Sequence, residues 1–331
     1  MTTKHSDGFL LWPSKQPNPK KQNYFASRDI VGELTDAVKE EGLQMGFYYC
    51  TAWDWTFNLN PIKDAQSFLE NYINPPEYTD YVNTHIYELI ENYGPMILWA
   101  DMGYPPGTNL LELFAYFYNR QPLGVINDRW KQLDPEKKKF SKLIHYDFLT
   151  PEYEISKKIK KRKWETCRGI GTSFGYNRFE TEEDYLSGKE LIHMFADIVS
   201  KNGNLLLNIG PQANGKIPEL QKKVLLELGE WLNSNGEAIF ETRPWRFAEG
   251  ITREGLQVRF THKNEILYAI ILGKPQNDII VIKNIGVNNV LNVELLGYKG
   301  KIEWDLKEED LLISFPKKII DSSAVSFKIS L

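Results

Sequence analysis

The feature that most constrains the fold is a change in the hydrophobic pattern near residues 240–248. Before it, short apolar runs alternate with stretches that carry an apolar face at helical spacing. After it, runs with period-two alternation follow one another between turn signals. Strands that alternate with helices pair in parallel through right-handed crossovers. We therefore predict a β/α domain over residues 1–244 and an all-β domain over residues 245–331.

The first domain has the pattern of an incomplete barrel. Its predicted strands cover residues 44–50, 96–100, 123–127, 142–146 and 204–209. Its predicted helices cover residues 28–41, 78–93, 110–118, 183–200 and 218–235. We count six or at most seven strand ends before residue 240, whereas a closed barrel has eight. The fold class predicted is α/β: a (β/α)8-like TIM barrel that lacks its first strands, followed by a C-terminal β-sandwich.

Composition and charge exclude several classes of protein. The 40 basic and 44 acidic side chains leave a net charge of −4, so no global basic field is available to gather nucleic acid. No stretch approaches the ~20 apolar residues of a membrane-spanning helix. The first residues contain no apolar signal core, and two cysteines cannot form a disulfide framework. We therefore expect a cytoplasmic protein with no membrane partner.

Two local patterns invite other functions. The basic run at residues 155–163 lacks interleaved aromatic residues, so a solvated loop is favoured over a nucleic-acid site. The glycines of residues 169–175 are followed by no Lys-Ser/Thr pair, which argues against a phosphate loop. Neither a Cys-x-x-Cys pair nor a His-x-x-x-His or EF-hand pattern occurs. We predict no metal and no cofactor.

Carboxylates and aromatic residues recur together where the predicted strands end. Aromatic residues make up 13% of the chain, more than a core alone requires. In a parallel barrel the functional groups lie at the C-terminal ends of the strands. Flat aromatic faces beside carboxylates suit a carbohydrate. Glycoside hydrolysis needs two carboxyl groups, about 5–5.5 Å apart for retention and about 6.5–9.5 Å apart for inversion.

Several carboxylates compete for a catalytic role. Asp101 follows a buried run and precedes a loop fixed by glycine and proline, and its spacing favours a functional and a purely structural role about equally. Asp128 is better explained by an ion pair with Arg129. Asp54, between two tryptophans, is better explained as a turn residue. Taken alone, Glu152 is better explained as a solvated loop residue.

A series of motifs, in order, covers residues 1–245. They are Thr2-Thr-Lys-His5-Ser-Asp-Gly-Phe9, Gly46-Phe-Tyr48-Tyr49, Trp53-Asp-Trp55, Ile97-Leu-Trp99-Ala-Asp101-Met-Gly103-Tyr-Pro105, Val125-Ile-Asn-Asp-Arg129-Trp130, Tyr146-Asp-Phe148 to Glu152-Tyr153, Lys163-Trp-Glu165-Thr to Gly175-Tyr-Asn177-Arg178, Val199-Ser-Lys-Asn-Gly-Asn-Leu-Leu-Leu-Asn-Ile-Gly-Pro211, Ile217-Pro-Glu, and Gly229-Glu-Trp231 to Arg243-Pro-Trp245. With a β-sandwich behind them, these motifs resemble the α-L-fucosidases of glycoside hydrolase family 29.

The resemblance implies a retaining exo-glycosidase that hydrolyses terminal α-L-fucosyl linkages in two steps. Asp101 matches the nucleophile that forms a covalent fucosyl-enzyme intermediate. Glu152 matches the acid/base, and this match outweighs the interpretation as a solvated loop residue. Glu165 is the rival acid/base, placed at a strand end, and we expect it to have a supporting role. The implied partner is a fucosylated oligosaccharide or glycoside.

The resemblance also implies a fucose pocket. Its matching residues are His5, Tyr48, Trp99, Arg129 and Phe174. His5 and Arg129 would bond hydroxyl groups of the sugar and the nucleophile. The rings of Trp99 and Phe174 would hold the sugar and its C6 methyl group.

Two departures from the family stand out. Ser6 replaces a histidine that many members carry, and this alters one hydrogen bond but need not remove activity. The first barrel strands are missing, so an upstream N-terminal segment is expected in a longer product. The alternative function is a catalytically incomplete fragment, or the half of a split reading frame, that is inactive without that segment. The linkage, the aglycone and a homo-oligomeric state stay open.

Overall fold

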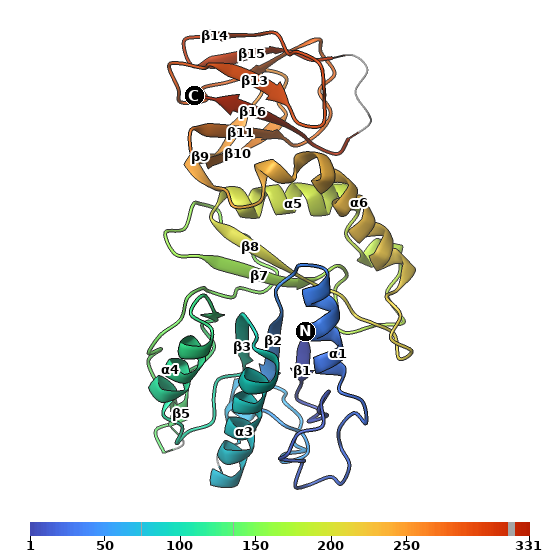
Figure 1. Cartoon of the computed structure of the whole chain (residues 1–331), viewed down its shortest axis with the longest axis vertical. Coiled ribbons are helices and arrows are strands. Elements are labelled where there is room, and N and C mark those ends of the chain that lie inside the picture. Colours follow the sequence, from blue (N-terminus) through green and yellow to red (C-terminus); the bar gives the residue numbers. More distant parts are fainter. Residues whose placement is uncertain (74, 135, 317–321) are drawn as a thin grey trace. The chain divides into compact units, whose positions relative to one another are not determined.

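The computed structural model describes residues 1–73, 75–134, 136–316 and 322–331. The chain divides into two compact units, Met1–Leu149 and Thr150–Leu331, which are described separately (Figure 1). Across the described ranges, every helix is too short or too polar to cross a membrane.

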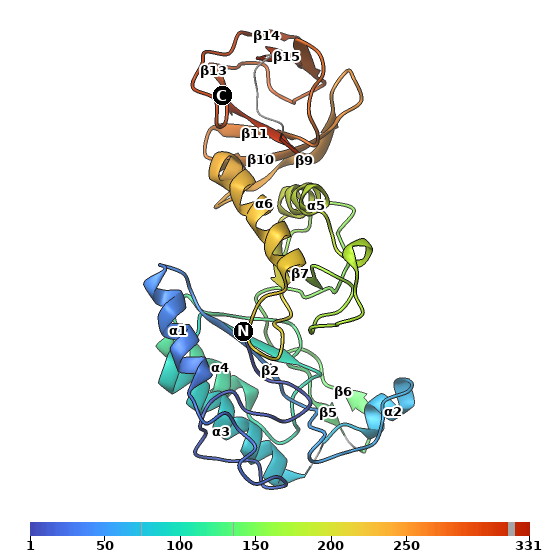
Figure 2. The same ribbon diagram turned by 90° about the vertical axis from the view of Figure 1, so that its right-hand side faces the viewer.

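The first unit is built on a four-stranded parallel sheet in the order β1-β2-β3-β4. The strands are β1 (Thr2–Lys4), β2 (Gly46–Cys50), β3 (Ile97–Asp101) and β4 (Val125–Ile126). The helices are α1 (Ile30–Glu40), α2 (Ala65–Glu70), α3 (Pro76–Tyr93) and α4 (Leu110–Arg120), and a small hairpin is formed by β5 (Leu133–Asp134) and β6 (Lys139–Phe140). Figure 2 shows α1, α3 and α4 on the same side of the sheet.

Alternation along the strands decides which side chains meet the helices. Phe47 and Tyr49 of β2, with Leu98 and Ala100 of β3, belong to the core that also contains residues of α1, α3 and α4. Successive side chains of a strand point to opposite faces. The residues between and after these, Tyr48, Trp99 and Asp101, therefore lie on the face turned away from the helices.

The second unit begins with a parallel strand pair and two helices. The pair is β7 (Trp164–Gly169) and β8 (Gly203–Asn208), and the helices are α5 (Gly188–Ser200) and α6 (Glu219–Asn235). Ser187 and Glu190 form a reciprocal capping box, which explains why α5 begins at Gly188. Short 3-10 helices cover Glu182–Asp184 and Gly236–Ala238.

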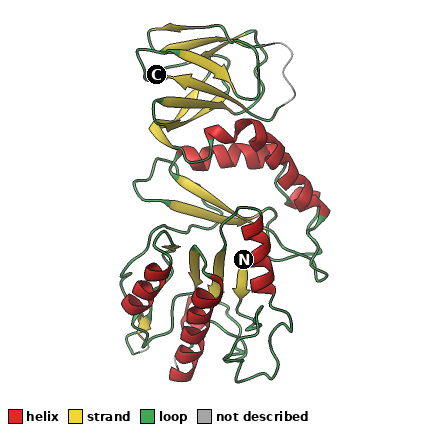
Figure 3. Cartoon of the chain, viewed as in Figure 1, coloured by secondary structure: helices red, strands yellow, loops and turns green. Residues whose placement is uncertain are grey.

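The rest of the second unit is a β-sandwich (Figure 3). A five-stranded antiparallel sheet has the order β13-β16-β11-β10-β9, and a three-stranded sheet has the order β12-β15-β14. The strands are β9 (Arg243–Ile251), β10 (Gln257–Lys263), β11 (Ile266–Ile271), β12 (Ile279–Ile282), β13 (Asn292–Leu295), β14 (Trp304–Lys307), β15 (Asp310–Ser314) and β16 (Val325–Ser330). One apolar core, including Phe260, Ile271, Ile282 and Ile313, joins the two sheets.

The five-stranded sheet buries its outer face against the two helices. Tyr268 and Ile270 of β11 share a core with Ile192 and Ala196 of α5 and with Trp231 of α6. The indole nitrogen of Trp231 donates a hydrogen bond to the carbonyl of Ala324 at 2.9 Å. Alternate side chains of β11 therefore belong to two different cores, one on each face of the sheet.

Most predicted elements are confirmed, and three regions differ. The helix predicted over residues 183–200 begins only at Gly188, after a separate 3-10 turn at Glu182–Asp184. Residues 142–146 form no strand, and their side chains are mostly exposed. Residues 164–169, interpreted as a segment after a strand, are strand β7 itself. The predicted domain boundary at 244/245 falls inside β9 and stays a prediction.

Candidate active site

Asp101 is the last residue of β3 and is 5% exposed. Its Oδ2 accepts a hydrogen bond from the Tyr48 hydroxyl at 2.6 Å. Its Oδ1 accepts from Arg129 Nη1 at 2.7 Å and from the backbone nitrogen of Met102 at 2.9 Å. Charge-assisted bonds of this kind hold a carboxylate in one orientation. Asp101 is therefore a fixed anion at the C-terminal end of a parallel strand.

A column of flat groups lies beside this carboxylate: two come from the middle of β2 and β3, and two from the segments that follow β1 and β4. The rings of His5 and Tyr48 stack at 5.3 Å, and those of Tyr48 and Trp99 stack at 5.4 Å. The guanidinium of Arg129 lies 4.4 Å from the centre of the Trp99 ring. Tyr48 and Trp99 are register partners in β2 and β3, which explains why their rings meet. The structure thus brings together five residues predicted for the site.

Hydrogen bonds run in one direction through this column. The backbone N–H of Ser6 donates to Nδ1 of His5 at 2.7 Å, so in neutral His5 the proton lies on Nε2. Nε2 is 3.1 Å from the Tyr48 oxygen and donates to it, because the Tyr48 proton is directed to Asp101. Partial desolvation lowers the pKa of His5, and burial raises the pKa of Tyr48. Both groups therefore stay neutral donors near neutral pH.

The backbone around the end of β3 is held by side chains of neighbouring strands. The hydroxyl of Thr51 donates to the carbonyl of Asp101 at 2.7 Å. The amide of Asn127 donates to the carbonyl of Ala100 at 2.8 Å, and its oxygen accepts from the Ala100 nitrogen at 3.1 Å. Met102 then adopts a φ of 64°, a conformation that side chains other than glycine rarely take. Strain of this kind is typical of functional sites.

Glu152, Glu165 and Phe174 belong to the second unit. Glu152 is exposed and forms a parallel bridge with Cys167 of β7. The carbonyl of Cys167 accepts from the nitrogen of Tyr153 at 3.1 Å, and the nitrogen of Cys167 donates to Pro151 at 3.0 Å. The backbone on both sides of Glu152 is therefore bound to the middle of β7.

Glu165 and Phe174 differ in their exposure to solvent. Glu165 is the second residue of β7 and is 8% exposed, so the expectation that it follows the C-terminal end of a strand is wrong. Phe174 is 38% exposed and meets the ring of Tyr153 edge-on at 5.3 Å. An exposed carboxyl group can exchange protons with solvent and substrate, which Glu152 allows better than Glu165.

Sequence reasoning missed Lys4, a residue whose side chain is completely buried. It pairs with Asp54, for which the sequence predicted only a turn. Asp54 does form that turn, since the nitrogen of Phe57 donates to its carbonyl at 3.0 Å. No feature of the sequence marks Lys4 as buried. In the described part of the chain, no group of three or more His, Cys, Asp and Glu side chains is arranged to hold a metal ion.

Comparisons with known proteins identify the family of this chain. The model of the α-L-fucosidase family matches residues 1–237, and that of the α-L-fucosidase C-terminal domain matches residues 253–330. An α-L-fucosidase of Branchiostoma floridae is 34% identical over 92% of this chain and 67% of its own length. The chain therefore spans about two thirds of that relative.

Solved structures give the same result. The crystal structure of Thermotoga maritima α-fucosidase with a mechanism-based inhibitor is 39% identical, with a TM-score of 0.89 over 100% of this chain and 74% of that one. A complex of the Thermotoga maritima enzyme with fucose is 38% identical, with a TM-score of 0.87 over 99% of this chain and 74% of that one. The predicted fold class, a (β/α)8-like barrel portion followed by a β-sandwich, is confirmed. The chain belongs to the α-L-fucosidase family of glycoside hydrolases.

Proposed function

We propose that this protein is a retaining exo-glycosidase that hydrolyses terminal α-L-fucosyl linkages of oligosaccharides or glycosides. The observation that carries the proposal is the Asp101 carboxylate, oriented by Tyr48 and Arg129 at the end of β3. A nucleophile must be held in line with the atom that it attacks, and such orientation contributes much of the rate enhancement. The fucose complex of the Thermotoga maritima relative supports the sugar class.

In the first step, a carboxylate oxygen of Asp101 attacks the anomeric carbon and the bond to the leaving oxygen breaks. Glu152 donates its proton to that oxygen, so the aglycone leaves as a neutral alcohol. In the second step, Glu152 takes a proton from water, and this water attacks the anomeric carbon and releases Asp101. Each group returns to its starting state, and the configuration of the sugar is retained.

The groups around Asp101 have the properties that a fucosyl pocket requires. Arg129 holds the nucleophile through Nη1 and presents other guanidinium N–H groups that can bond sugar hydroxyls. His5 supports the nucleophile through its hydrogen bond to Tyr48, whose hydroxyl donates to Asp101. Trp99 is stacked between Tyr48 and Arg129, so we assign the edge of its ring to the contact with the C–H groups of a pyranose ring. For the C6 methyl group, the family resemblance implies Phe174 of the second unit, an exposed ring.

The first test is release of p-nitrophenol from p-nitrophenyl α-L-fucoside by the 331-residue chain. Asp101→Gly should fold normally and lose essentially all turnover. Sodium azide should restore cleavage in this variant, because it replaces the missing carboxylate as the nucleophile. Asp305→Gly, which removes an exposed aspartate from β14, is the control and should keep full activity. Near-normal turnover by Asp101→Gly would refute the nucleophile assignment.

The acid/base assignment has its own test. Glu152→Gly should slow substrates with poor leaving groups, such as alkyl fucosides, far more than p-nitrophenyl fucoside. An activated leaving group departs without a proton, so only the poor one depends on the acid. Equal losses on both substrates would move the role to Glu165 or to another carboxyl group.

The same assay addresses the alternative function, a chain that is inactive without an upstream segment. A soluble, folded chain that releases no p-nitrophenol and does not bind L-fucose in calorimetry would favour that alternative. The cytoplasmic location and a homo-oligomeric state stay predictions.

A further inference from the structure

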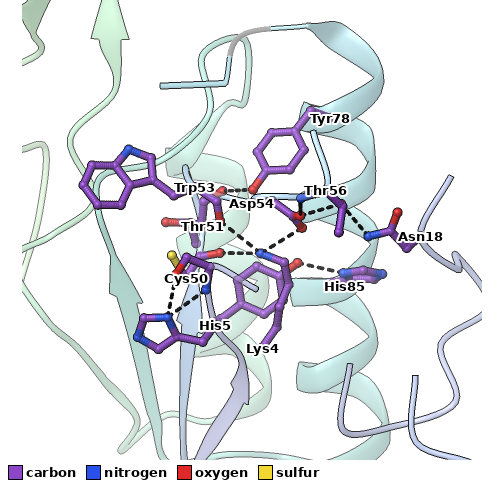
Figure 4. Close-up of polar contacts among 12 residues, drawn as sticks. Lys4, His5, Asn18, Cys50, Thr51, Trp53, Asp54, Thr56, Tyr78 and His85 are labelled. Atoms are coloured by element: carbon purple, nitrogen blue, oxygen red, sulfur yellow. Dashed lines mark hydrogen bonds and ion pairs between the residues drawn. The ribbon is translucent and has the colours of Figure 1, made fainter. Parts of the chain in front are cut away.

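Lys4 and Asp54 form an ion pair in which both side chains have no exposure to solvent (Figure 4). Nζ of Lys4 lies 3.3 Å from Oδ2 of Asp54. The same nitrogen donates to the carbonyl of Cys50 at 2.9 Å and to that of Trp53 at 3.3 Å. An ammonium group has three protons, and three oxygens surround this one. The cation is therefore saturated by partners from one short segment, residues 50–54.

A buried ion pair contributes little net free energy to the stability of a fold. Taking two charges out of water costs free energy that their attraction only partly returns, and apolar side chains of similar volume often stabilise as well or better. A buried pair is more easily explained where it fixes a geometry that apolar packing would leave loose. The location of this pair indicates which geometry it fixes.

Asp54 packs against the loop that carries His5. The nitrogen of Trp55 donates to the carbonyl of Ser6 at 2.7 Å, which joins the two loops. A Cβ atom on Gly8 would lie 2.5 Å from Oδ1 of Asp54, so this loop passes in close contact with the carboxylate. Lys4 is the residue immediately before His5 and anchors the same loop from β1.

The pair also reaches the backbone of the proposed nucleophile. The carbonyl that Lys4 binds belongs to Cys50, which is the register partner of Asp101 between β2 and β3. The next residue, Thr51, donates its backbone nitrogen to the Asp101 carbonyl at 3.1 Å and its hydroxyl at 2.7 Å. One ammonium group thus fixes both His5 and the strand end that holds Asp101.

The two charges act as a unit. Oδ1 of Asp54 accepts from the nitrogen of Thr56 at 2.9 Å and from its hydroxyl at 2.5 Å. Oδ2 faces Lys4 and has no hydrogen bond to any other described residue. Loss of either charge would leave the other buried and uncompensated.

We propose that the Lys4–Asp54 pair is a positioning element that holds His5 and Asp101 in register for fucoside cleavage. This inference rests on the proposed function. A displacement of about 1 Å in such a site can cost about 10²-fold in rate. Disruption of the pair should therefore lower kcat/KM for p-nitrophenyl α-L-fucoside by about 10-fold to 10²-fold, mostly through kcat.

The test separates positioning from stability with three variants of the full chain. Lys4→Met and Asp54→Asn should each lower the melting temperature, because each leaves one buried charge without its partner. The double variant removes both charges and should recover much of that loss. Its kcat/KM should nevertheless stay at least 10-fold below the wild-type value, since the clamp is still absent. Recovery of kcat/KM together with melting temperature would show a purely structural pair and overturn the proposal.

A matched control is Glu88→Gln. Glu88 is also a buried carboxylate of the first unit, and it accepts from the Trp12 indole at 3.1 Å and from the nitrogen of Lys15 at 2.8 Å. This variant should lose stability and keep kcat/KM within about twofold of the wild type, because these partners lie outside the site.

Nitrogen-15 NMR of the histidine rings gives a readout that needs no turnover. The His5 signals, assigned by their absence in His5→Asn, should show the Nε2–H tautomer in the wild type and in Glu88→Gln. In the double variant they should show averaging between tautomers. An unchanged His5 spectrum in the double variant would overturn the inference even if the wild-type chain cleaves no fucoside. An inactive wild type with the expected spectra would refute only the proposed function.

Discussion

At the scale of single residues, His85 shows how burial alone couples this fold to pH. Its side chain has no exposure to solvent. Nδ1 accepts from the Tyr49 hydroxyl at 2.7 Å, and Nε2 donates to the carbonyl of Gln16 at 2.8 Å. Burial lowers the pKa of His85 to about 3, from an ordinary value of 6.5. The native state therefore keeps this ring neutral where the unfolded state would protonate it.

This difference predicts a pH dependence of stability. Between pH 6.5 and about 3, unfolding takes up a proton at His85, so the free energy of unfolding falls as the pH falls. One proton corresponds to about 1.4 kcal/mol per pH unit. His85→Gln keeps a donor and an acceptor but cannot titrate, so urea unfolding from pH 6.5 to 4.5 should show a shallower dependence by about that slope. Equal slopes for His85→Gln and the wild type would contradict the prediction.

Single residues also show what a sequence can reveal about a site. Asp101 could be singled out because a buried run ends at it and a rigid turn follows, but that pattern favoured a functional and a structural role about equally, and the family resemblance decided between them. The column from His5 to Arg129 could be named only through the family resemblance, since it depends on the register between strands. Lys4 and Asp54 lie 50 positions apart, and neither the resemblance nor the local pattern indicated that they pair.

At the scale of elements, the turn after β3 matters most, because it begins at Asp101. Gly103 adopts a φ of 83°, and a Cβ atom there would lie 2.7 Å from the Tyr72 hydroxyl and 2.8 Å from the Lys131 carbonyl. Gly107, in the same loop, adopts a φ of 90° with nothing within 4 Å of such an atom. The two positions share the backbone strain and differ only in the space around them.

Comparison of Gly103→Ala with Gly107→Ala therefore separates the cost of backbone strain at a positive φ from the cost of steric overlap of the added methyl group. Each should lose about 1 kcal/mol from the unfavourable φ. Gly103→Ala should lose about 1–3 kcal/mol more, because a backbone carbonyl has to move. It should also lower kcat/KM on p-nitrophenyl α-L-fucoside, while Gly107→Ala should not. Equal losses in denaturant unfolding would mean that the turn yields freely around Gly103.

The elements that the sequence predicted well are those with a strong apolar pattern. Strands β2 and β3 and helices α3 and α6 begin and end within two residues of the prediction. The pattern failed at residues 142–146, where apolar residues occur in a segment that stays largely exposed. The pattern also failed at β7, because the charged residues Glu165 and Arg168 interrupt the apolar pattern expected of a buried strand.

At the scale of the whole molecule, we expect the helices and strands that share one hydrophobic core to unfold together. Helices α5 and α6 come before the predicted boundary at 244/245, yet they share a core with the outer face of the sandwich. Neighbouring residues of β11 face opposite ways: Ile270 meets the helices, and Ile271 meets the other sheet. Both are completely buried. This pair of residues can show whether the helices are stabilised by the barrel portion or by the sandwich.

Ile270→Ala and Ile271→Ala should each cost about 2–5 kcal/mol of stability, because both leave a cavity in a packed core. Hydrogen exchange should then distinguish them. Ile270→Ala should speed exchange of the α5 and α6 amides, since it removes the contact that ties the helices to β11. Ile271→Ala should speed exchange mainly in the three-stranded sheet of β12, β14 and β15. If Ile270→Ala left α5 and α6 as protected as in the wild type, their stability would come from the β7–β8 side, and the boundary near residue 244 would mark two independent folding units.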